Sequence, residues 1–300
     1  MRRAAVAVAA LLAVACGEPE PKKPAKFACP PPPEPSHQAV VVGTIGKLHL
    51  VESRYPLSKL GDVIVALKPD LVLLGVRVDP YREGHLEDGS FEMTYVQHVA
   101  KQRGIDIEPI DWFQERDLGA APPAVEPWDE AEIAKREAAV LSEPRLFTFE
   151  QANGNELEAK LFLAFGAEQR HRNGNGVVTR RQAHLQSLVA SALTRHDKPK
   201  RVVAFVDVFD RPTVDLATRA LGYDARTPAE AMAKSKDGII PDIPAEVLAE
   251  WRAQLDRARA KASSAEGPTK SFWAEREQVL KVAVERKASC CVTQAALQGK

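Results

Sequence analysis

Four short apolar runs, separated by segments of helical periodicity, constrain the fold of this sequence most strongly. They are residues 40–44, 71–78, 105–110 and 201–208, which read VVVGT, LVLLGVRV, IDIEPI and RVVAFVDV. Continuous apolar runs of this length are typical of strands buried on both faces, as in parallel sheets. Because helical segments lie between them, the pattern predicts βαβ units with right-handed crossovers. The sequence therefore predicts an α/β fold with a mostly parallel central sheet flanked by helices.

Helices are expected where apolar residues recur three or four positions apart, as Leu57, Leu60 and Ile64 do. Such segments are residues 56–67, 91–103, 129–141, 151–171, 178–195, 245–260 and 272–286. The last two have weaker apolar stripes, so we expect extra C-terminal helices on the outside of the same domain. This gives an α/β domain over residues 38–225 and a helical extension over residues 226–300.

The first residues, MRRAAVAVAALLAVACG, predict a signal for export. Residues 1–15 form the signal peptide, and the segment AVAC resembles a bacterial lipobox in which Cys16 is lipidated and becomes the first mature residue. Ordinary cleavage and an uncleaved anchor are the alternatives. Gly17 replaces the aspartate that signals retention in the inner membrane, so the expected location is the outer membrane, facing the periplasm. The membrane is therefore one expected partner, through the lipid on Cys16.

Residues 16–37 are rich in proline and predict an extended stalk between the lipid and the domain. The whole chain has 41 basic and 41 acidic residues. Removal of Arg2 and Arg3 with the signal leaves a net charge of about −2. No basic block is present, so nucleic acid is excluded as a partner.

Three further cysteines remain, and export places them in an oxidising compartment. Cys29 could pair with Cys290 or Cys291 and tie the stalk to the C-terminus. The alternative is that all three are free. Metal binding by the adjacent pair is a third and weaker interpretation, because no CxxC motif or histidine lies nearby.

The common enzyme motifs are absent from the sequence. GTIGKL at residues 43–48 has the wrong glycine spacing for a phosphate loop, and GxSxG, HExxH and CxxC do not occur. Polar residues do follow the expected strands, at the edge where α/β proteins bind ligands. They are His49, Arg77, Asp79, Asp111, Asp207 and Asp210. Such a set could hold a divalent metal or divide acid and base work, while capping and solubility are the alternative explanation.

Two more residues are candidates for a site. Glu92 begins an expected helix, where stabilising the positive helix end is its ordinary role. Arg181 falls on an apolar helix stripe, so it needs an anionic partner, which is either a carboxylate of the fold or a ligand. Glu92, Asp111 and Arg181 are therefore the catalytic candidates.

The order of these segments resembles the TraB/PrgY/Tiki superfamily, whose relatives include ChaN-like haem-binding lipoproteins and erythromycin esterases. The similarity spans residues 38–225. It rests on the turn after the first strand and on four later segments: KPDLVLLGVR, GIDIEPIDW, TRRQAHLQSLVASAL and KRVVAFVDVFDRPTVDLATRALGY. Members resemble metal-dependent hydrolases or peptidases, or they bind ligands.

The residues of the family motifs match this chain only in part. Gly46 stands where the GxxH motif has its histidine, and His49 corresponds to a second histidine found in some members. Gly75 replaces the glutamate that closes the second strand. The arginine of the late helix is matched by Arg181. After the fourth strand Asp207 and Asp210 replace a glycine and a histidine.

Since glycine neither coordinates a metal nor moves a proton, the resemblance implies a pseudoenzyme whose emptied cleft binds a ligand or peptide without catalysis. His49, Arg77, Asp111, Arg181 and Asp210 would line this cleft. The alternative is a metal-dependent hydrolase or peptidase with a rebuilt site, with metal candidates His49, Asp111 and Asp210 and a contribution from Glu92. A second alternative is haem binding through an axial ligand such as His49 or Tyr55. A divalent metal or haem would be a cofactor only under these alternatives.

Overall fold

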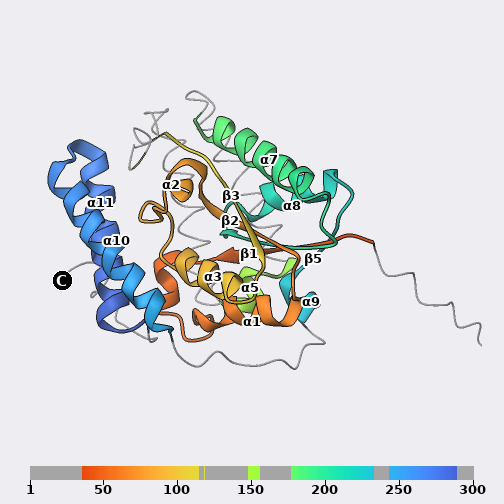
Figure 1. The fold of residues 1–300 in the computed structure, drawn as a ribbon, viewed down its shortest axis with the longest axis horizontal. Coiled ribbons are helices and arrows are strands. Elements are labelled where there is room, and N and C mark those ends of the chain that lie inside the picture. The colour runs from red at the N-terminus through yellow and green to blue at the C-terminus, as the bar shows by residue number, and fades with distance from the viewer. Residues whose placement is uncertain (1–35, 115–117, 119–147, 156–176, 233–242, 289–300) are drawn as a thin grey trace, which may run out of the picture. The chain divides into compact units, whose positions relative to one another are not determined.

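The computed structural model describes residues 36–114, 118, 148–155, 177–232 and 243–288, all within one compact unit (Figure 1). Several expectations from the sequence therefore lie outside the described residues. They are the signal peptide, Cys16 and nearly all of the stalk, the helix at 129–141, most of the helix at 151–171, and Cys29, Cys290 and Cys291.

Five parallel strands form one sheet in the order β3-β2-β4-β1-β5. The strands are β1 (Gln38–Thr44), β2 (Leu71–Arg77), β3 (Asp106–Asp111), β4 (Arg201–Asp207) and β5 (Asp224–Arg226). The first four coincide with the four apolar runs, so the predicted α/β fold with a parallel sheet is confirmed. β5 was not expected, because its three residues carry no apolar pattern.

The helices alternate with these strands along the chain. They are η1 (Gly46–Leu50), α1 (Ser58–Leu67), α2 (Val78–Arg82), α3 (Glu92–Lys101), α5 (Phe149–Ala152), α7 (Val177–Arg195), α8 (Arg211–Ala220), α9 (Pro228–Met232), α10 (Ala245–Ser264) and α11 (Gly267–Glu285). Across the described ranges, no helix combines the length and the hydropathy needed to cross a membrane.

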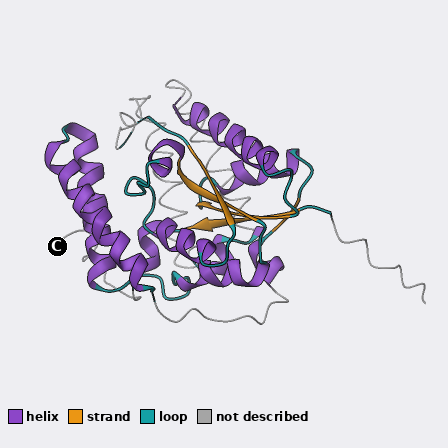
Figure 2. Cartoon of the chain, viewed as in Figure 1, coloured by secondary structure: helices purple, strands orange, loops and turns teal. Residues whose placement is uncertain are grey.

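Helices cover both faces of the sheet, as Figure 2 shows. Successive strand residues point to opposite faces. Val42 and Leu74 belong to a core shared with α1, α3, α10 and α11, whereas Val41 and Leu73 face α7 and α8. Burial on both faces explains why the strands read as continuous apolar runs and do not alternate with polar residues.

The connections that leave two neighbouring parallel strands, β2 and β4, run towards opposite edges of the sheet. After β2 the chain continues through α3 to β3 at one edge, on the face that α1 also covers. After β4 it continues through α8, on the opposite face, towards β5 at the other edge. The loops that follow these strands therefore diverge, and such a switch point is where open α/β sheets bind ligands. Arg77 and Asp207 end the two strands.

Helices α10 and α11 pack against each other, and α10 also packs against α3. The expected position on the outside holds only for part of their surface, because each buries a tryptophan: Trp251 is 0% exposed and Trp273 is 1% exposed. The indole N–H of Trp251 donates to the carbonyl of Phe91 over 2.9 Å. An aromatic side chain buried in this way removes roughly 200 Å² from water, on the order of 5 kcal/mol. Each tryptophan is the largest member of a buried face, which in α10 also contains Val247 and Leu248 and in α11 also contains Val279 and Leu280.

Candidate functional site

A salt-bridge cluster joins the carboxyl end of β3 to α7 and to the start of α8. Arg181 of α7 donates to both carboxylate oxygens of Asp111 over 3.0 and 2.9 Å, and to both of Asp210 over 2.6 and 2.7 Å. These bonds use four of the five N–H groups of the guanidinium. Burial opposes the charge, but the two carboxylates hold the pKa of Arg181 well above its ordinary value. The sequence left two kinds of partner open for Arg181, a carboxylate of the fold or a ligand. In the structure, the carboxylates of Asp111 and Asp210 are its partners.

Asp207 ends β4 beside this cluster and titrates near neutrality. Burial, reinforced by the charge of Asp210, raises the pKa of Asp207 to about 7, although the N–H of Phe209 donates to its carboxylate over 2.9 Å. Burial also raises the pKa of Asp210, against the opposing effect of Arg181. Arg181 thus has two carboxylates as hydrogen-bond partners, and its charge also acts on Asp207, in the direction that lowers the pKa. Protonation of Asp207 removes its repulsion with Asp210.

His49 lies apart from the hydrogen bonds of this cluster, in the turn η1 after β1. Its side chain is 1% exposed, and both ring nitrogens are engaged by backbone groups. Nε2 accepts from the N–H of Ile45 over 3.3 Å, and Nδ1 lies 2.9 Å from the carbonyl of Tyr55. This pattern requires the neutral tautomer with the proton on Nδ1. Burial lowers the pKa of His49, despite the opposing charge of Glu92. His49 therefore fixes the turn, and neither of its nitrogens faces an open site.

Tyr55, the other haem candidate, is enclosed with His49. The phenol O–H of Tyr55 donates to the carbonyl of Gly43 over 2.9 Å and accepts from the side-chain amide of Asn153 over 3.2 Å. The amide oxygen of Asn153 in turn accepts from the N–H of Gly43 over 2.8 Å. Tyr55 and Asn153 are both 0% exposed, and burial raises the pKa of Tyr55. An axial haem ligand has to be accessible, and here both candidate side chains hold the end of β1.

The two glycines of the incomplete family motifs differ in their surroundings. Gly46 has φ +53°, in the left-handed region that favours glycine, and an added Cβ would meet only the hydroxyl of Ser90, at 3.7 Å. An added Cβ on Gly75 would come within 3.1 Å of the backbone of both Phe205 and Val206 in β4. The expectation that both glycines open space at the rim is therefore corrected at Gly75, where the neighbouring strand fills the space.

Glu92 is a buried carboxylate at the first residue of α3. It is 0% exposed, and neither carboxylate oxygen has a hydrogen-bond partner among the described residues. Its charge acts on Arg276 of α11, whose pKa burial lowers and Glu92 raises. The guanidinium of Arg276 donates to the carbonyl of Asp88 over 3.2 Å, which places it beside the same loop. Helix α11 thus supplies a positive charge that interacts with Glu92. The N-terminal end of α3 supplies a second one.

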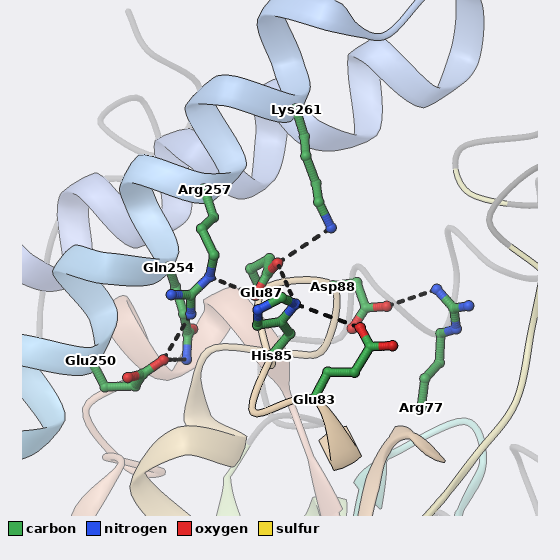
Figure 3. Close-up of polar contacts among 9 residues, drawn as sticks. All are labelled: Arg77, Glu83, His85, Glu87, Asp88, Glu250, Gln254, Arg257 and Lys261. Carbon is green, nitrogen blue, oxygen red and sulfur yellow. Dashed lines mark hydrogen bonds and ion pairs between the residues drawn. The ribbon is translucent and has the colours of Figure 1, made fainter. Parts of the chain in front are cut away.

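Arg77 is paired within the chain as well. It donates to the carboxylate of Asp88 over 2.9 Å (Figure 3). Its guanidinium also lies 4.9 Å from the ring centre of Phe113. Burial raises the pKa of Asp88, and Arg77 opposes this rise. The guanidinium is therefore held by a buried acid and an aromatic face, at the end of β2 where a ligand contact was expected.

Glu87, next to Asp88, connects the same loop to α10 (Figure 3). Its side chain is 1% exposed and lies 3.0 Å from Nε of Arg257 and 3.2 Å from Nζ of Lys261. Burial alone would raise the pKa of Glu87, but its own backbone N–H and these two cations together lower it. Arg257 also reaches Glu250 over 2.9 Å. The C-terminal helices are thus attached by charge as well as by their tryptophans.

The structure separates the predicted site residues into three groups. Asp111, Arg181 and Asp210 meet, Arg77 pairs with Asp88, and His49 is enclosed by backbone. Within the described ranges, no three side chains of His, Cys, Asp or Glu are gathered so as to hold a metal ion.

Comparisons of this chain with protein-family models, with curated proteins and with solved structures found no match.

Sequence reasoning missed the residues that complete these clusters. Asp88 and Glu87 lie in the polar loop HLEDGS, which gave no sign that it would be buried. Asn153 follows the short helix α5, and Arg276 lies among many charged residues of α11. No local pattern in the sequence marked these residues as buried.

Proposed function

We propose that this chain is a lipid-anchored protein of the cell envelope whose degenerate TraB/Tiki-like domain binds a small ligand or a peptide without catalysis. The anchor is Cys16, and residues 16–37 hold the domain away from the outer membrane on its periplasmic side. This proposal rests on the export signal and lipobox of the sequence together with the contacts at the rim of the sheet.

The observation that carries the noncatalytic part is the engagement of Arg181 and His49 by other groups of the chain. Arg181 spends four N–H groups on Asp111 and Asp210, and both nitrogens of His49 contact backbone atoms. A metal ion or a substrate would have to displace these contacts, each of which satisfies a buried group. Gly46 and Gly75 add no group that could replace them.

Metal retention tests this proposal. The purified full chain, prepared in detergent and incubated with Mn²⁺, Zn²⁺ and Co²⁺ before desalting, is expected to retain less than a stoichiometric amount of each metal by mass spectrometry. Stoichiometric retention that is lost in Asp210→Asn but kept in the exposed control Asp256→Asn would overturn it. Labelling of the wild type with an alkyne fatty acid, and its loss in Cys16→Ala, tests the anchor separately.

A metal-dependent hydrolase or peptidase is the second candidate, and two observations favour it. The pKa of Asp207, about 7, suits a group that exchanges protons near neutral pH, and Glu92 is a buried acid without a hydrogen-bond partner among the described residues. A carboxyl group whose pKa is raised as that of Asp207 is raised marks candidate functional sites. This candidate predicts hydrolysis whose rate changes around pH 7 and whose pH dependence is lost in Asp207→Asn.

A further inference from the structure

A pocket of about 330 Å³ lies between α3 and α10, on the α3 side of the sheet. It is lined by Tyr81, Gly84, Leu86, Thr94, Gln97, His98, Lys101, Glu246, Val247 and Glu250. This volume is at the lower end of the range of about 300–1,000 Å³ that is typical of small-molecule sites.

The pocket has an apolar base and charged walls. Leu86 and Val247 are 3% and 1% exposed, so they form a buried base. Lys101, an exposed residue at the end of α3, supplies a positive charge. Glu246 and Glu250, one turn apart on α10, supply two negative charges on the facing wall, and Arg257 pairs with Glu250 over 2.9 Å, which leaves one negative charge in excess. A ligand that spans the pocket from α3 to α10 would meet charges of opposite sign.

A buried acceptor without a partner lies beside the acidic wall. Gln254 is 1% exposed, and its amide N–H groups donate to the hydroxyl of Thr94 over 2.8 Å and to Glu250 over 3.2 Å (Figure 3). These two partners both line the pocket, and they fix which end of the amide is nitrogen. The amide oxygen of Gln254 has no hydrogen-bond partner among the described residues. Gln254 is not among the residues that line the pocket, and its amide N–H groups hold Thr94 and Glu250, which do line it, from behind.

We infer that this pocket binds a small zwitterion of amino-acid to short-peptide size, with its ammonium group towards Glu246 and Glu250. An ammonium carries three N–H donors and no acceptor, which matches the carboxylate oxygens of this wall. The carboxylate end of the ligand lies towards Lys101. Leu86 and Val247 contact the carbon atoms between the two ends. This inference rests on the proposed function, because it assigns the place and the chemistry of the binding.

Calorimetry with the purified full chain in detergent tests the inference, with alanine, dialanine and trialanine as probes. We expect at least one of them to bind with a Kd below about 1 mM. N-acetylation removes the ammonium and C-amidation removes the carboxylate, so each is expected to weaken binding by about tenfold or more. Binding of neither the free nor the blocked probes, or equal binding of both, overturns the inference.

Variants locate the site. Lys101→Gln and Glu246→Gln are expected to weaken binding by about tenfold, whereas Lys270→Gln and Glu266→Gln on exposed positions of the C-terminal helices leave it unchanged. Binding that is unaffected by the first pair overturns the location. Mass spectrometry of the recovered probes separates this inference from the proposed function: intact probes that fail to bind contradict only the inference, and hydrolysed probes contradict noncatalytic binding.

Discussion

Asp111 and Arg181 lie 70 residues apart in the chain, and two hydrogen bonds of 3.0 and 2.9 Å join them. The same guanidinium holds Asp210, so one cation connects the end of β3 with the start of α8. The residues that the sequence offers as a ligand-binding set are thus each other's partners. Because these residues pair with one another, substituting them should change the stability of the fold, which can be measured without any ligand.

Replacement of Arg181 by alanine is expected to destabilise the fold. It leaves the carboxylates of Asp111 and Asp210, which are 7% and 6% exposed, without their cation. Breaking a buried ion pair in this way lowers the free energy of unfolding by about 3 kcal/mol. Urea unfolding measures it, with Arg252→Ala on the exposed surface of α10 as the control. Equal unfolding midpoints for the two variants would contradict the prediction.

Asp207 is expected to make the fold less stable as the pH rises. Its pKa is 3.8 in the unfolded reference and about 7 in the folded chain, so between these values the folded state binds more protons than the unfolded state. The free energy of unfolding therefore falls as the pH rises from about 4 to about 7. Asp207→Asn keeps an oxygen for the N–H of Phe209 and removes this slope.

Thermal or urea unfolding at pH 5 and pH 8 checks the sign. Asp207→Asn should gain stability over the wild type at pH 8 and lose this advantage at pH 5, whereas the exposed control Asp256→Asn should follow the wild type at both. An advantage of Asp207→Asn that is the same at both pH values would show that the carboxyl is not perturbed.

His49 is expected to make the fold less stable as the pH falls, which is the opposite of the effect of Asp207. Its pKa is lowered by burial from 6.5, so the unfolded state binds the extra proton first as the pH falls. The stability that neutral His49 provides is present above pH 6.5 and is lost as the pH falls below it towards the folded pKa. NMR titration of the ring carbons should give His49 a midpoint below 6.5.

His49→Ala should cost about 2 kcal/mol or more, because the N–H of Ile45 and the carbonyl of Tyr55 lose their partners. His85→Ala is the matched control. A titration midpoint of His49 at or above 6.5, and an alanine variant as stable as the control, would place the ring in solvent.

The attachment of α10 through Glu87 is expected to depend on charge. Glu87→Gln leaves Arg257 and Lys261 facing a neutral amide, and it should lower the free energy of unfolding by about 1 kcal/mol, because both cations are partly exposed and solvent screens them. Added salt should reduce the difference between this variant and the wild type. Glu266→Gln serves as the control, and a loss that does not change with salt would contradict an electrostatic attachment.

The fold could be predicted from the sequence, because strands that are buried on both faces consist of continuous apolar runs. Val40 to Val42 and Leu71 to Leu74 read as buried strands in any context, and the helices between them follow from their spacing. β5 contains no apolar run: it reads DAR, and it pairs with β1 at one edge of the sheet. The packing of α10 and α11 includes one buried tryptophan in each helix. The spacing of apolar residues does not predict how much surface a single tryptophan buries.

The candidate site was less predictable, because pairing between distant side chains leaves no local pattern. The position of Arg181 on an apolar stripe did indicate a buried partner, and the partner proved to be two of the predicted rim acids. His49 was misplaced for a different reason: a histidine in a strand-end turn looks the same in sequence whether its nitrogens meet backbone or solvent. Asn153, which completes the contacts around Gly43, lies 110 residues away.

Hydrolysis by the purified full chain tests the central claim most directly. Peptide and ester substrates are incubated with the wild type, Asp210→Asn and Asp256→Asn, each with Mn²⁺, Zn²⁺ or Co²⁺, and the products are measured by mass spectrometry. Binding without catalysis predicts product formation at the level of the buffer alone for all three proteins. Turnover by the wild type and Asp256→Asn that Asp210→Asn abolishes would contradict it.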